Sequence, residues 1–380
     1  MQKATTAELK KTNIKNVLGF IYGRKKTSKL EIATQLDLSR PTVSQIVQDL
    51  MDQGVITRKG RFESTGGRKA DALVFLPRAR VAVGVELLKE SFEIVAIDLY
   101  GEIIHSEMQL LPFSNTPDYV RAVCEAINHF INGLPVEPAR VLGVNIVLQG
   151  LISSDGELVT YGKILGCTGM SIRQFKPYLK YPCAMAHDGE AAATVELWFS
   201  PDIINAIFVH IRYNMSGALI IGGKFLRGNE LKSGVFEHMT IVPGGRPCYC
   251  GKRGCVDTYC TLSALLKPGE TVSKFFQALR AGAADETARW DEYLNYLAIA
   301  IDNLHMMMDY DVILGGILGR FLLPADIARL QELIAGRTAF PTERRFIRIG
   351  ATARIPIAAG AALPYVIHYL GFQSQGQGVS

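Results

Sequence analysis

The sequence lacks the features of an exported or membrane-spanning protein. Its first fifteen residues contain no apolar segment of the kind that forms a secretion signal, so we expect a cytoplasmic protein. Residues 355–372 contain no Asp, Glu, Lys or Arg and just reach the length of a membrane span. Pro356, Pro364 and His368 interrupt that segment, and its small residues make it weakly hydrophobic. We therefore expect a buried Ala/Gly-rich helix that packs closely on its neighbours.

The chain also has few tryptophans (two), but 48% of its 380 residues are hydrophobic. That content excludes wholesale disorder, collagen-like repeats and disulfide scaffolds, and the length predicts two or three domains. The net charge of +5 conceals an asymmetry. Residues 1–80 hold 16 Lys and Arg against seven Asp and Glu, whereas residues 81–380 hold 25 against 29. A basic front end on a mildly acidic body indicates an anion-binding module joined to another domain.

The front end has the pattern of a winged helix-turn-helix. Apolar periodicity predicts helices over residues 11–22 and 28–36, and a third from Arg40 that stops at Gly54. Ser39 is a suitable N-cap for the third helix, which begins Arg40-Pro41. Two short strands follow, at residues 55–58 and 72–76, around a basic glycine-containing tip. Helices and hairpin together predict a DNA-binding domain.

The side chains that we expect to contact double-stranded DNA lie on the third helix and around it. Arg, Gln, Ser and Thr are the types that reach base edges and phosphates in a major groove, and basic residues at the wing tip suit a minor groove or phosphates. The predicted contacts are Lys29, Ser39, Arg40, Thr42, Ser44, Gln45, Gln48, Arg68 and Lys69. The alternative is a small helical protein-interaction module with a solvated basic face.

The remainder of the chain reads as an α/β body. Strand-like segments at residues 81–87, 93–99, 101–110 and 141–148, with a helix at 119–131 before the last of them, give a β-β-β-α-β order. Further strands are expected near residues 206–211 and 217–221. This order predicts a mixed sheet with crossover helices.

Clustered cysteines give the strongest local motif of the body. Cys248, Cys250 and Cys255 lie within eight residues, and His238 lies ten residues upstream. Three thiolates and one imidazole suit a tetrahedral, structural Zn²⁺ ion, one per chain, with no open position for catalysis. The alternative is that the thiols are simply buried apolar groups. We expect Cys260 to be packed in the interior and not to bind metal.

The run from Cys248 to Cys255, CYCGKRGC, together with the upstream His238 and a winged helix that ends in Ser-Thr-Gly-Gly-Arg-Lys, resembles the ROK family (repressors, open reading frames, kinases). The resemblance covers about residues 11–365. It implies an actin-like (ribonuclease H-like) two-lobed sugar-kinase fold behind the DNA-binding domain. The expected domains are 1–78 (winged helix), 79–190 completed by a C-terminal helix at about 355–372 (first lobe), and 191–354 (second lobe, with the zinc site and oligomer interface).

Kinases of this family carry glycine-rich phosphate loops, which this chain keeps only in part. The turn after the first strand of the body, at residues 84–89, lacks the paired glycines and the Thr of the family motif. The second loop corresponds to residues 212–217, where only the last glycine remains, whereas Leu314-Gly315-Gly316 still resembles the nucleoside-side glycines. Because phosphoryl transfer depends on such loops, we expect that the protein is not an enzyme.

The resemblance also implies a sugar site that is partly changed. Asp188 matches the base of the kinases, His187 and Glu190 stand in place of two amides, and Val235 replaces a sugar-binding Glu. These changes predict an effector other than the family's usual glucose-like or N-acetylhexosamine ligands. The expected effector-binding residues are Gln149, Gly150, His187, Asp188, Glu190, His238 and Asp257. The alternative is a vestigial pocket without a ligand.

These features together predict a cytoplasmic transcriptional regulator, by family default a repressor, of carbohydrate metabolism or transport genes. A homodimer or tetramer would bind a palindromic operator, and lobe closure around a small carbohydrate would shift the spacing of two winged helices. Two other functions stay open at this point: a bifunctional sugar kinase, and a regulator that is controlled by a protein partner.

Overall fold

A winged helix forms the N-terminal end of the molecule. The computed structural model describes residues 6–62, 71–340 and 342–371. Helices α1 (Thr6–Arg24), α2 (Lys29–Gln35) and α3 (Arg40–Asp52) pack on a sheet of order β1-β3-β2, formed by β1 (Lys26–Thr27), β3 (Asp71–Phe75) and β2 (Ile56–Arg61). The side chains of Ser28 and Ser39 cap α2 and α3 by accepting from Glu31 N–H and Thr42 N–H. The wing tip, with Arg68 and Lys69, lies outside the described residues.

The first lobe of the body is a five-stranded mixed sheet of order β10-β7-β4-β5-β6. Strands β4, β7 and β10 run parallel, and β5 and β6 continue the sheet as an antiparallel meander. Helix α4 (Pro117–Asn132) covers one face, where Val83 and Val85 join its buried side chains. The strands are β4 (Val81–Leu87), β5 (Ser91–Ile97), β6 (Ile103–Leu110), β7 (Val141–Leu148) and β10 (Cys183–His187), with a small hairpin of β8 (Leu151–Ile152) and β9 (Val159–Tyr161).

The other face of this sheet is covered by α11 (Ile357–Leu370), which is the Ala/Gly-rich segment of the sequence. Its backbone lies against the strands: a Cβ added at Gly84 would lie 1.7 Å from the carbonyl oxygen of Ala358. Gly360 meets helix α5 (Asp188–Phe199) almost as closely, since an added Cβ would lie 2.0 Å from Ala191 O. Small residues thus allow a close approach of backbones, as expected. Within the described ranges no helix is long and apolar enough to cross a membrane.

The second lobe is built on a sheet of order β13-β12-β11-β14-β15. Its helices bury Phe275, Trp290 and Leu297 against strands β11 and β14. The strands are β11 (Ala206–Ile211), β12 (Met215–Ile221), β13 (Lys224–Phe225), β14 (Asp311–Gly315) and β15 (Ile347–Ile349). The helices are α6 (Leu262–Leu265), α7 (Val272–Arg280), α8 (Ala284–Met307), α9 (Gly316–Gly319) and α10 (Pro324–Ala335). Helix α5 (Asp188–Phe199) lies between the lobes and packs on α11 and β12.

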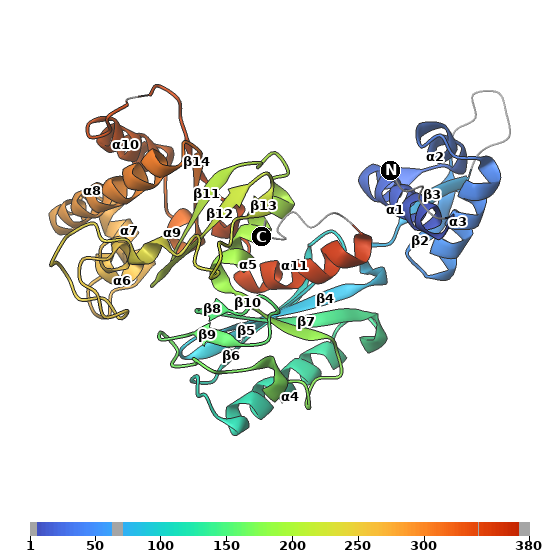
Figure 1. Ribbon diagram of the computed structural model, residues 1–380, viewed down its shortest axis with the longest axis horizontal. Coiled ribbons are helices and arrows are strands. Elements are labelled where there is room, and N and C mark those ends of the chain that lie inside the picture. Colours follow the sequence, from blue (N-terminus) through green and yellow to red (C-terminus); the bar gives the residue numbers. More distant parts are fainter. Residues whose placement is uncertain (1–5, 63–70, 341, 372–380) are drawn as a thin grey trace.

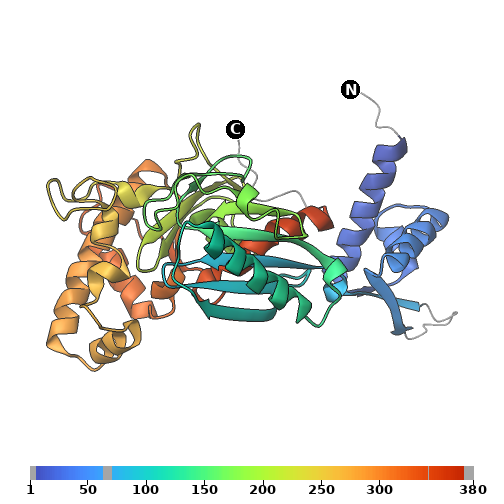
Figure 2. The same cartoon turned by 90° about the horizontal axis from the view of Figure 1, so that it is seen from below.

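The winged helix and the body share one hydrophobic cluster. Figures 1 and 2 show the winged helix at one end of the molecule and the helices of the second lobe at the other. Val17 and Ile21 of α1 belong to the same buried cluster as Val366 and Leu370 of α11. Three rings reinforce the contact: Tyr22 lies 5.2 Å from Phe75 and 4.6 Å from Tyr100, measured between ring centroids. The winged helix is therefore packed on the body through side-chain contacts.

The predicted elements agree closely with the observed ones. Strands β4, β7 and β11 have the predicted bounds. Strand β5 begins and ends two residues earlier than the expected 93–99, and α1 begins at Thr6 where the apolar pattern indicated residue 11. Helix α4 begins at Pro117, two residues before the predicted start, because the Thr116 side chain caps it by accepting from Tyr119 N–H.

Candidate effector, metal and DNA-binding sites

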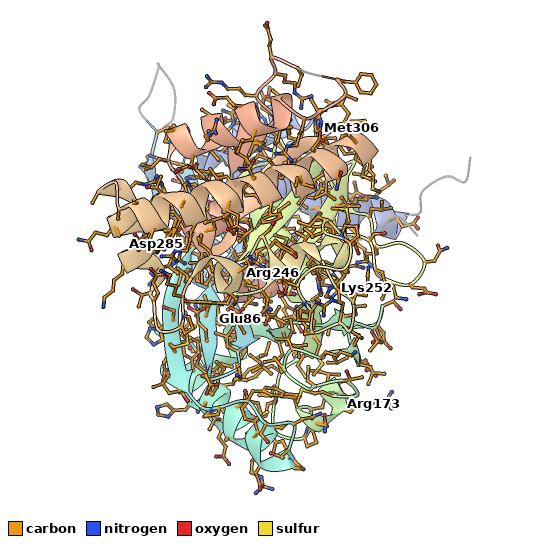
Figure 3. The ribbon with its side chains drawn as sticks, turned by 90° about the vertical axis from the view of Figure 1, so that its left-hand side faces the viewer. Glu86, Arg173, Arg246, Lys252, Asp285 and Met306 are labelled. Carbon is orange, nitrogen blue, oxygen red and sulfur yellow. The ribbon has the colours of Figure 1, made fainter. Side chains whose placement is uncertain are left out.

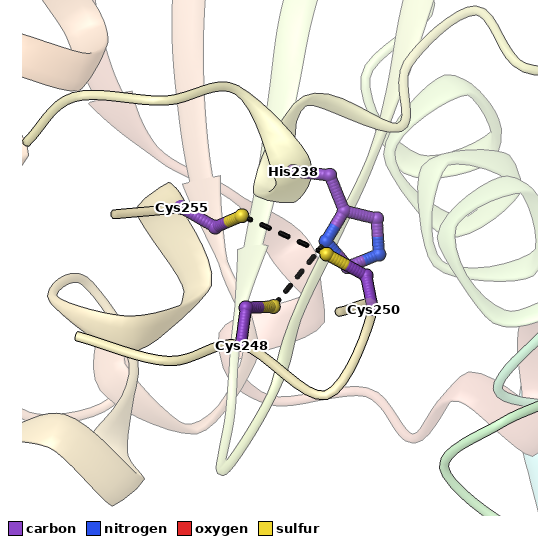
Figure 4. A group of neighbouring side chains, drawn as sticks. All are labelled: His238, Cys248, Cys250 and Cys255. Carbon is purple, nitrogen blue, oxygen red and sulfur yellow. Dashed lines mark hydrogen bonds between the residues drawn. The ribbon is translucent and has the colours of Figure 1, made fainter. Parts of the chain in front are cut away.

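Four potential metal ligands converge at a tight loop of the second lobe. A short 3₁₀ turn (Phe236–His238) presents His238, and a β-bridge between Thr240 and Cys255 brings the cysteine loop beside it. Gly254, with φ of +81°, is required there, because an added Cβ would lie 1.7 Å from Val242 O. Figure 4 shows the side chains of His238, Cys248, Cys250 and Cys255 pointing toward one another.

The spacing of these four side chains fits a tetrahedral zinc site. Their ligand atoms all lie within 4.8 Å of one another. Cys248 Sγ is 3.6 Å from His238 Nδ1, and Cys250 Sγ is 3.8 Å from Cys255 Sγ. A tetrahedron with Zn–S arms of about 2.3 Å and a Zn–N arm of about 2.0 Å has edges of about 3.5–3.8 Å. The residues therefore fit the ion, and they leave no fifth position. Cys260 is fully buried, as expected.

A cavity of about 420 Å³ lies directly beside the cysteine loop. Of the predicted effector-binding residues, Gln149, Gly150, His187, Asp188 and His238 line it. Asp188 is 3% exposed and begins α5, with its Oδ1 3.4 Å from His187 Nε2. Two buried residues that we did not predict, Ser216 and Glu237, also line the cavity. Ser216 belongs to the segment that corresponds to the second phosphate loop, and Glu237 lies between Val235 and His238 in the segment compared with the family's sugar site, but neither was predicted to bind the effector.

The two other predicted effector-binding residues lie elsewhere. Glu190 is held by Arg227 through two hydrogen bonds of 2.8 and 2.9 Å, and it lines a separate cavity of about 750 Å³ that shares His187 with the first. Asp257 is buried, and its Oδ1 accepts a hydrogen bond of 2.9 Å from Met215 N–H. It is not among the residues lining the 420 Å³ cavity. Asp257 therefore fixes the start of β12.

The segments that correspond to the two altered phosphate loops meet at an ion pair between the lobes. Glu86 of β4 is 2% exposed and pairs with Arg212, which follows β11 directly. Burial raises the pKa of the Glu86 carboxyl, and the Arg212 guanidinium opposes that rise. Figure 3 shows Glu86 in the interior, where the two lobes meet. Glu93 of β5 and Asp188 also interact with the charge of Arg212.

The predicted DNA-binding side chains gather around α3. Arg40, Gln45 and Gln48 are exposed, and the two amides donate 2.8 Å hydrogen bonds to Asp49 and Asp52 one turn further on. Ser39 and Thr42 are engaged with each other, since their hydroxyl oxygens lie 2.8 Å apart. Ser44 and Lys29 are half-buried. Helix α3 is the second helix of the α2–α3 pair, and polar groups on one face of that helix are typical of a helix that reads the major groove.

Helix α5 connects the 420 Å³ cavity with the winged helix. His187 and Asp188 lie at its start, and Trp198 near its end donates a 2.8 Å hydrogen bond to Tyr100 O. Tyr100 in turn contacts Tyr22 of α1 and donates from its hydroxyl to Tyr22 O at 3.2 Å. One buried helix thus has the candidate ligand at one end and the DNA-binding module at the other.

These features define a class of protein: a winged helix of the DNA-binding type on a two-lobed, sugar-kinase-like α/β body. The chain belongs to the ROK family, whose sequence model matches residues 82–331. The MarR family model matches residues 15–69, which include α2, α3 and the second half of α1.

Relatives and solved structures agree with this assignment. The chain is 29% identical over 278 residues to the xylose repressor of Bacillus subtilis (strain 168), which is 72% of this chain and 72% of that protein. It is 26% identical over 241 residues to the DNA-binding transcriptional dual regulator NagC of Escherichia coli (strain K12), covering 63% of this chain and 59% of NagC.

Two solved structures show the fold. The structure of a ROK family transcriptional regulator, a homologue of the E. coli MLC protein, has a TM-score of 0.73 at 19% identity and covers 95% of this chain and 98% of that one. A ROK family glucokinase from Streptomyces griseus, in complex with glucose and AMPPNP, has a TM-score of 0.64 at 20% identity and covers 75% of this chain and 98% of that one. The second match omits about the length of the winged helix.

Proposed function

We propose that this protein is a DNA-binding repressor of carbohydrate metabolism or transport genes, controlled by a small sugar-like effector. The proposal rests on one observation. The chain combines a polar face on α3 with a cavity that is lined by buried carboxyl groups, and helix α5 connects that cavity with the winged helix. The repressors among its relatives, which include xylose repressors, support the same function.

Helix α5 supports a direct route of control. Its twelve residues span about 18 Å at 1.5 Å per residue. A ligand that binds Asp188 at the start of α5 shifts this helix and with it Trp198. Because Trp198 is hydrogen-bonded to Tyr100, the contact between Tyr100 and Tyr22 shifts too. Ligand binding and operator binding then favour different positions of α5, which is the condition for thermodynamic coupling between two sites.

We further propose that the protein does not phosphorylate its effector. The Glu86–Arg212 pair supports this, since Arg212 stands where the family's second phosphate loop has small residues. A guanidinium paired with a buried carboxylate has little remaining charge for a nucleotide. The alternative, a bifunctional sugar kinase, predicts ATP turnover that depends on Asp188.

The cysteine loop would hold one structural zinc ion through His238, Cys248, Cys250 and Cys255. Bound there, the ion would stiffen the loop beside the effector cavity, because His238 belongs to both. We expect one metal equivalent in purified protein, lost in Cys250→Ser together with the thermal stability of the second lobe. Cys183→Ser, at a half-buried cysteine outside the cluster, is the matched control and keeps the metal.

The domain division of residues 1–78, 79–190 with 355–372, and 191–354, and assembly into a dimer or tetramer, belong to the same proposal. The two sheets support the division, because one uses strands between Val81 and His187 and the other uses strands between Ala206 and Ile349. Light scattering at operator-binding concentrations measures the assembly.

Operator titration tests the proposed function. A duplex is selected from a random library with the full chain and titrated with and without xylose, glucose, N-acetylglucosamine and their phosphates. We expect nanomolar binding that at least one sugar weakens tenfold or more, with no ATP hydrolysis. Selection of no sequence contradicts the DNA-binding function. A selected sequence with no response to any sugar contradicts the effector, and would favour control by a protein partner.

A further inference from the structure

Two buried oxygens of the 420 Å³ cavity have no hydrogen-bond partner among the described residues. They are Glu237 Oε2 and Ser216 Oγ. Glu237 is 6% exposed and Ser216 is 4% exposed, so neither oxygen reaches bulk solvent. They come from different elements, the 3₁₀ turn at Phe236–His238 and strand β12, yet both line one cavity with Asp188.

Such groups are uncommon, because a buried polar atom without a partner loses its hydration and gains nothing in exchange. The charged side chains at this cavity do not supply the missing donors. Lys163 and Lys232 line it but are exposed, and Lys232 pairs with Glu230. Two residues that line the cavity therefore each carry a buried oxygen without a partner, while the cations remain in solvent.

The remaining lining indicates what that partner is. Apolar side chains of Leu151, Ile164, Met215 and Val235, and the rings of Tyr161 and Tyr249, lie around the three oxygen-bearing residues. A ligand that fits must have C–H faces for the apolar walls and several hydroxyl groups for the oxygens. The volume lies at the lower end of the range of small-ligand pockets, roughly 300–1,000 Å³.

We propose that Glu237 and Ser216 are specificity-determining residues of the effector cavity, which hydrogen-bond hydroxyl groups of a monosaccharide-sized polyol held beside Asp188. This inference rests on the proposed function, because it names the contacts of the same cavity. It assigns the choice of ligand to two residues brought together from separate parts of the chain. A sugar that lacks a hydroxyl at either oxygen leaves that oxygen buried and unpaired, and is rejected for that reason.

Calorimetry on the full, metal-loaded chain tests the assignment with the sugar panel described above and deoxy analogues of its tightest binder. Glu237→Gln keeps the size of the side chain, and we expect roughly tenfold to hundredfold weaker binding. Ser216→Ala should weaken binding about tenfold. At least one deoxy analogue should bind wild type at least tenfold more weakly than the parent sugar does. Glu237→Gln should bind that analogue and the parent sugar with equal affinity. Glu125→Gln, on the exposed surface of α4, is the control.

The possible results separate this inference from the function on which it rests. The metal content and melting temperature of each variant exclude a folding defect as the cause of a loss. If no sugar binds wild type, the proposed effector function fails and this inference falls with it. If a sugar binds wild type and both variants equally, or if every deoxy analogue loses the same affinity in wild type and Glu237→Gln, the inference alone is overturned.

Discussion

Replacing Arg212 by Met tests the buried ion pair between the lobes. The substitution keeps an aliphatic side chain and leaves the Glu86 carboxyl without its partner in a site that is 2% exposed. Removing one partner of a buried pair costs about 3–5 kcal/mol of the free energy of unfolding. The Arg212 side chain is 19% exposed, so we expect the lower value, about 3 kcal/mol. At about 2 °C per kcal/mol for a protein of this size, the melting temperature should fall by about 6 °C.

The pH dependence of that loss gives a sharper criterion. Burial already raises the pKa of Glu86, and removal of Arg212 removes the influence that opposes the rise. A carboxyl whose pKa is higher in the folded state binds its proton more tightly there. The loss relative to wild type is therefore small below the already raised pKa of Glu86 in the wild type, and grows by up to about 1.4 kcal/mol per pH unit until the still higher folded pKa of the variant is reached. The variant should thus be more impaired at about pH 8 than at about pH 5.5.

Differential scanning calorimetry at the two pH values measures both effects. Glu86→Gln/Arg212→Met removes the uncompensated charge as well and should recover most of the loss. Arg348→Met is the matched control, since Arg348 pairs with Asp202 on the surface, and such pairs contribute about 0–1 kcal/mol. If Arg212→Met lowers the free energy of unfolding by less than about 1 kcal/mol, and equally at both pH values, the Glu86–Arg212 pair is not shielded from solvent and our reasoning is refuted.

Three further predictions concern DNA binding, coupling and packing. Gln45→Ala should cost about 1–3 kcal/mol of operator binding and relax base preference, whereas equal losses on operator and random duplex would mean that Gln45 does not read bases. Trp198→Phe removes the hydrogen bond to Tyr100 O. In operator titrations, saturating sugar should then change the operator affinity two- to tenfold less than in wild type, while the operator affinity without sugar changes little. An unchanged sugar effect would exclude the α5 route. Gly84→Ala should lower the melting temperature by several degrees, because its Cβ would lie 1.7 Å from Ala358 O, and an unaltered melting curve would mean that α11 shifts freely.

Local patterns predicted most of the elements and the cluster of four potential metal ligands. Ser39 before Arg40-Pro41 marks the start of α3 within the chain itself, and the cysteine loop is defined by eight consecutive residues with His238 nearby. These features depend on neighbours in sequence, which is why they could be interpreted without the fold. The helix at Ile357–Leu370 was equally accessible, since its composition already indicated close packing.

Features that depend on distant partners could not be predicted. Glu86 and Arg212 are 126 positions apart, and neither residue alone indicates an ion pair. Glu190 matched a local sugar-site motif, yet Arg227, 37 positions away, holds its carboxylate. Glu237 is the opposite case. It lies between Val235 and His238 in the segment compared with the family's sugar site, but its own role was not predicted, and its importance follows from an oxygen without a partner on a residue that lines the cavity.

The hydrophobic cluster shared by α1 and α11 has a consequence for how operators are recognised. A DNA-binding domain on a flexible linker binds half-sites over a range of separations, because the linker lets the distance between two such domains vary. Here Val17 and Ile21 of α1 belong to one buried cluster with Val366 and Leu370 of the body, so the direction in which α3 points is set by the body. In any assembly of this chain, the permitted distance between half-sites is then a property of the subunit interface. Inserting or deleting one base pair between half-sites should be poorly tolerated.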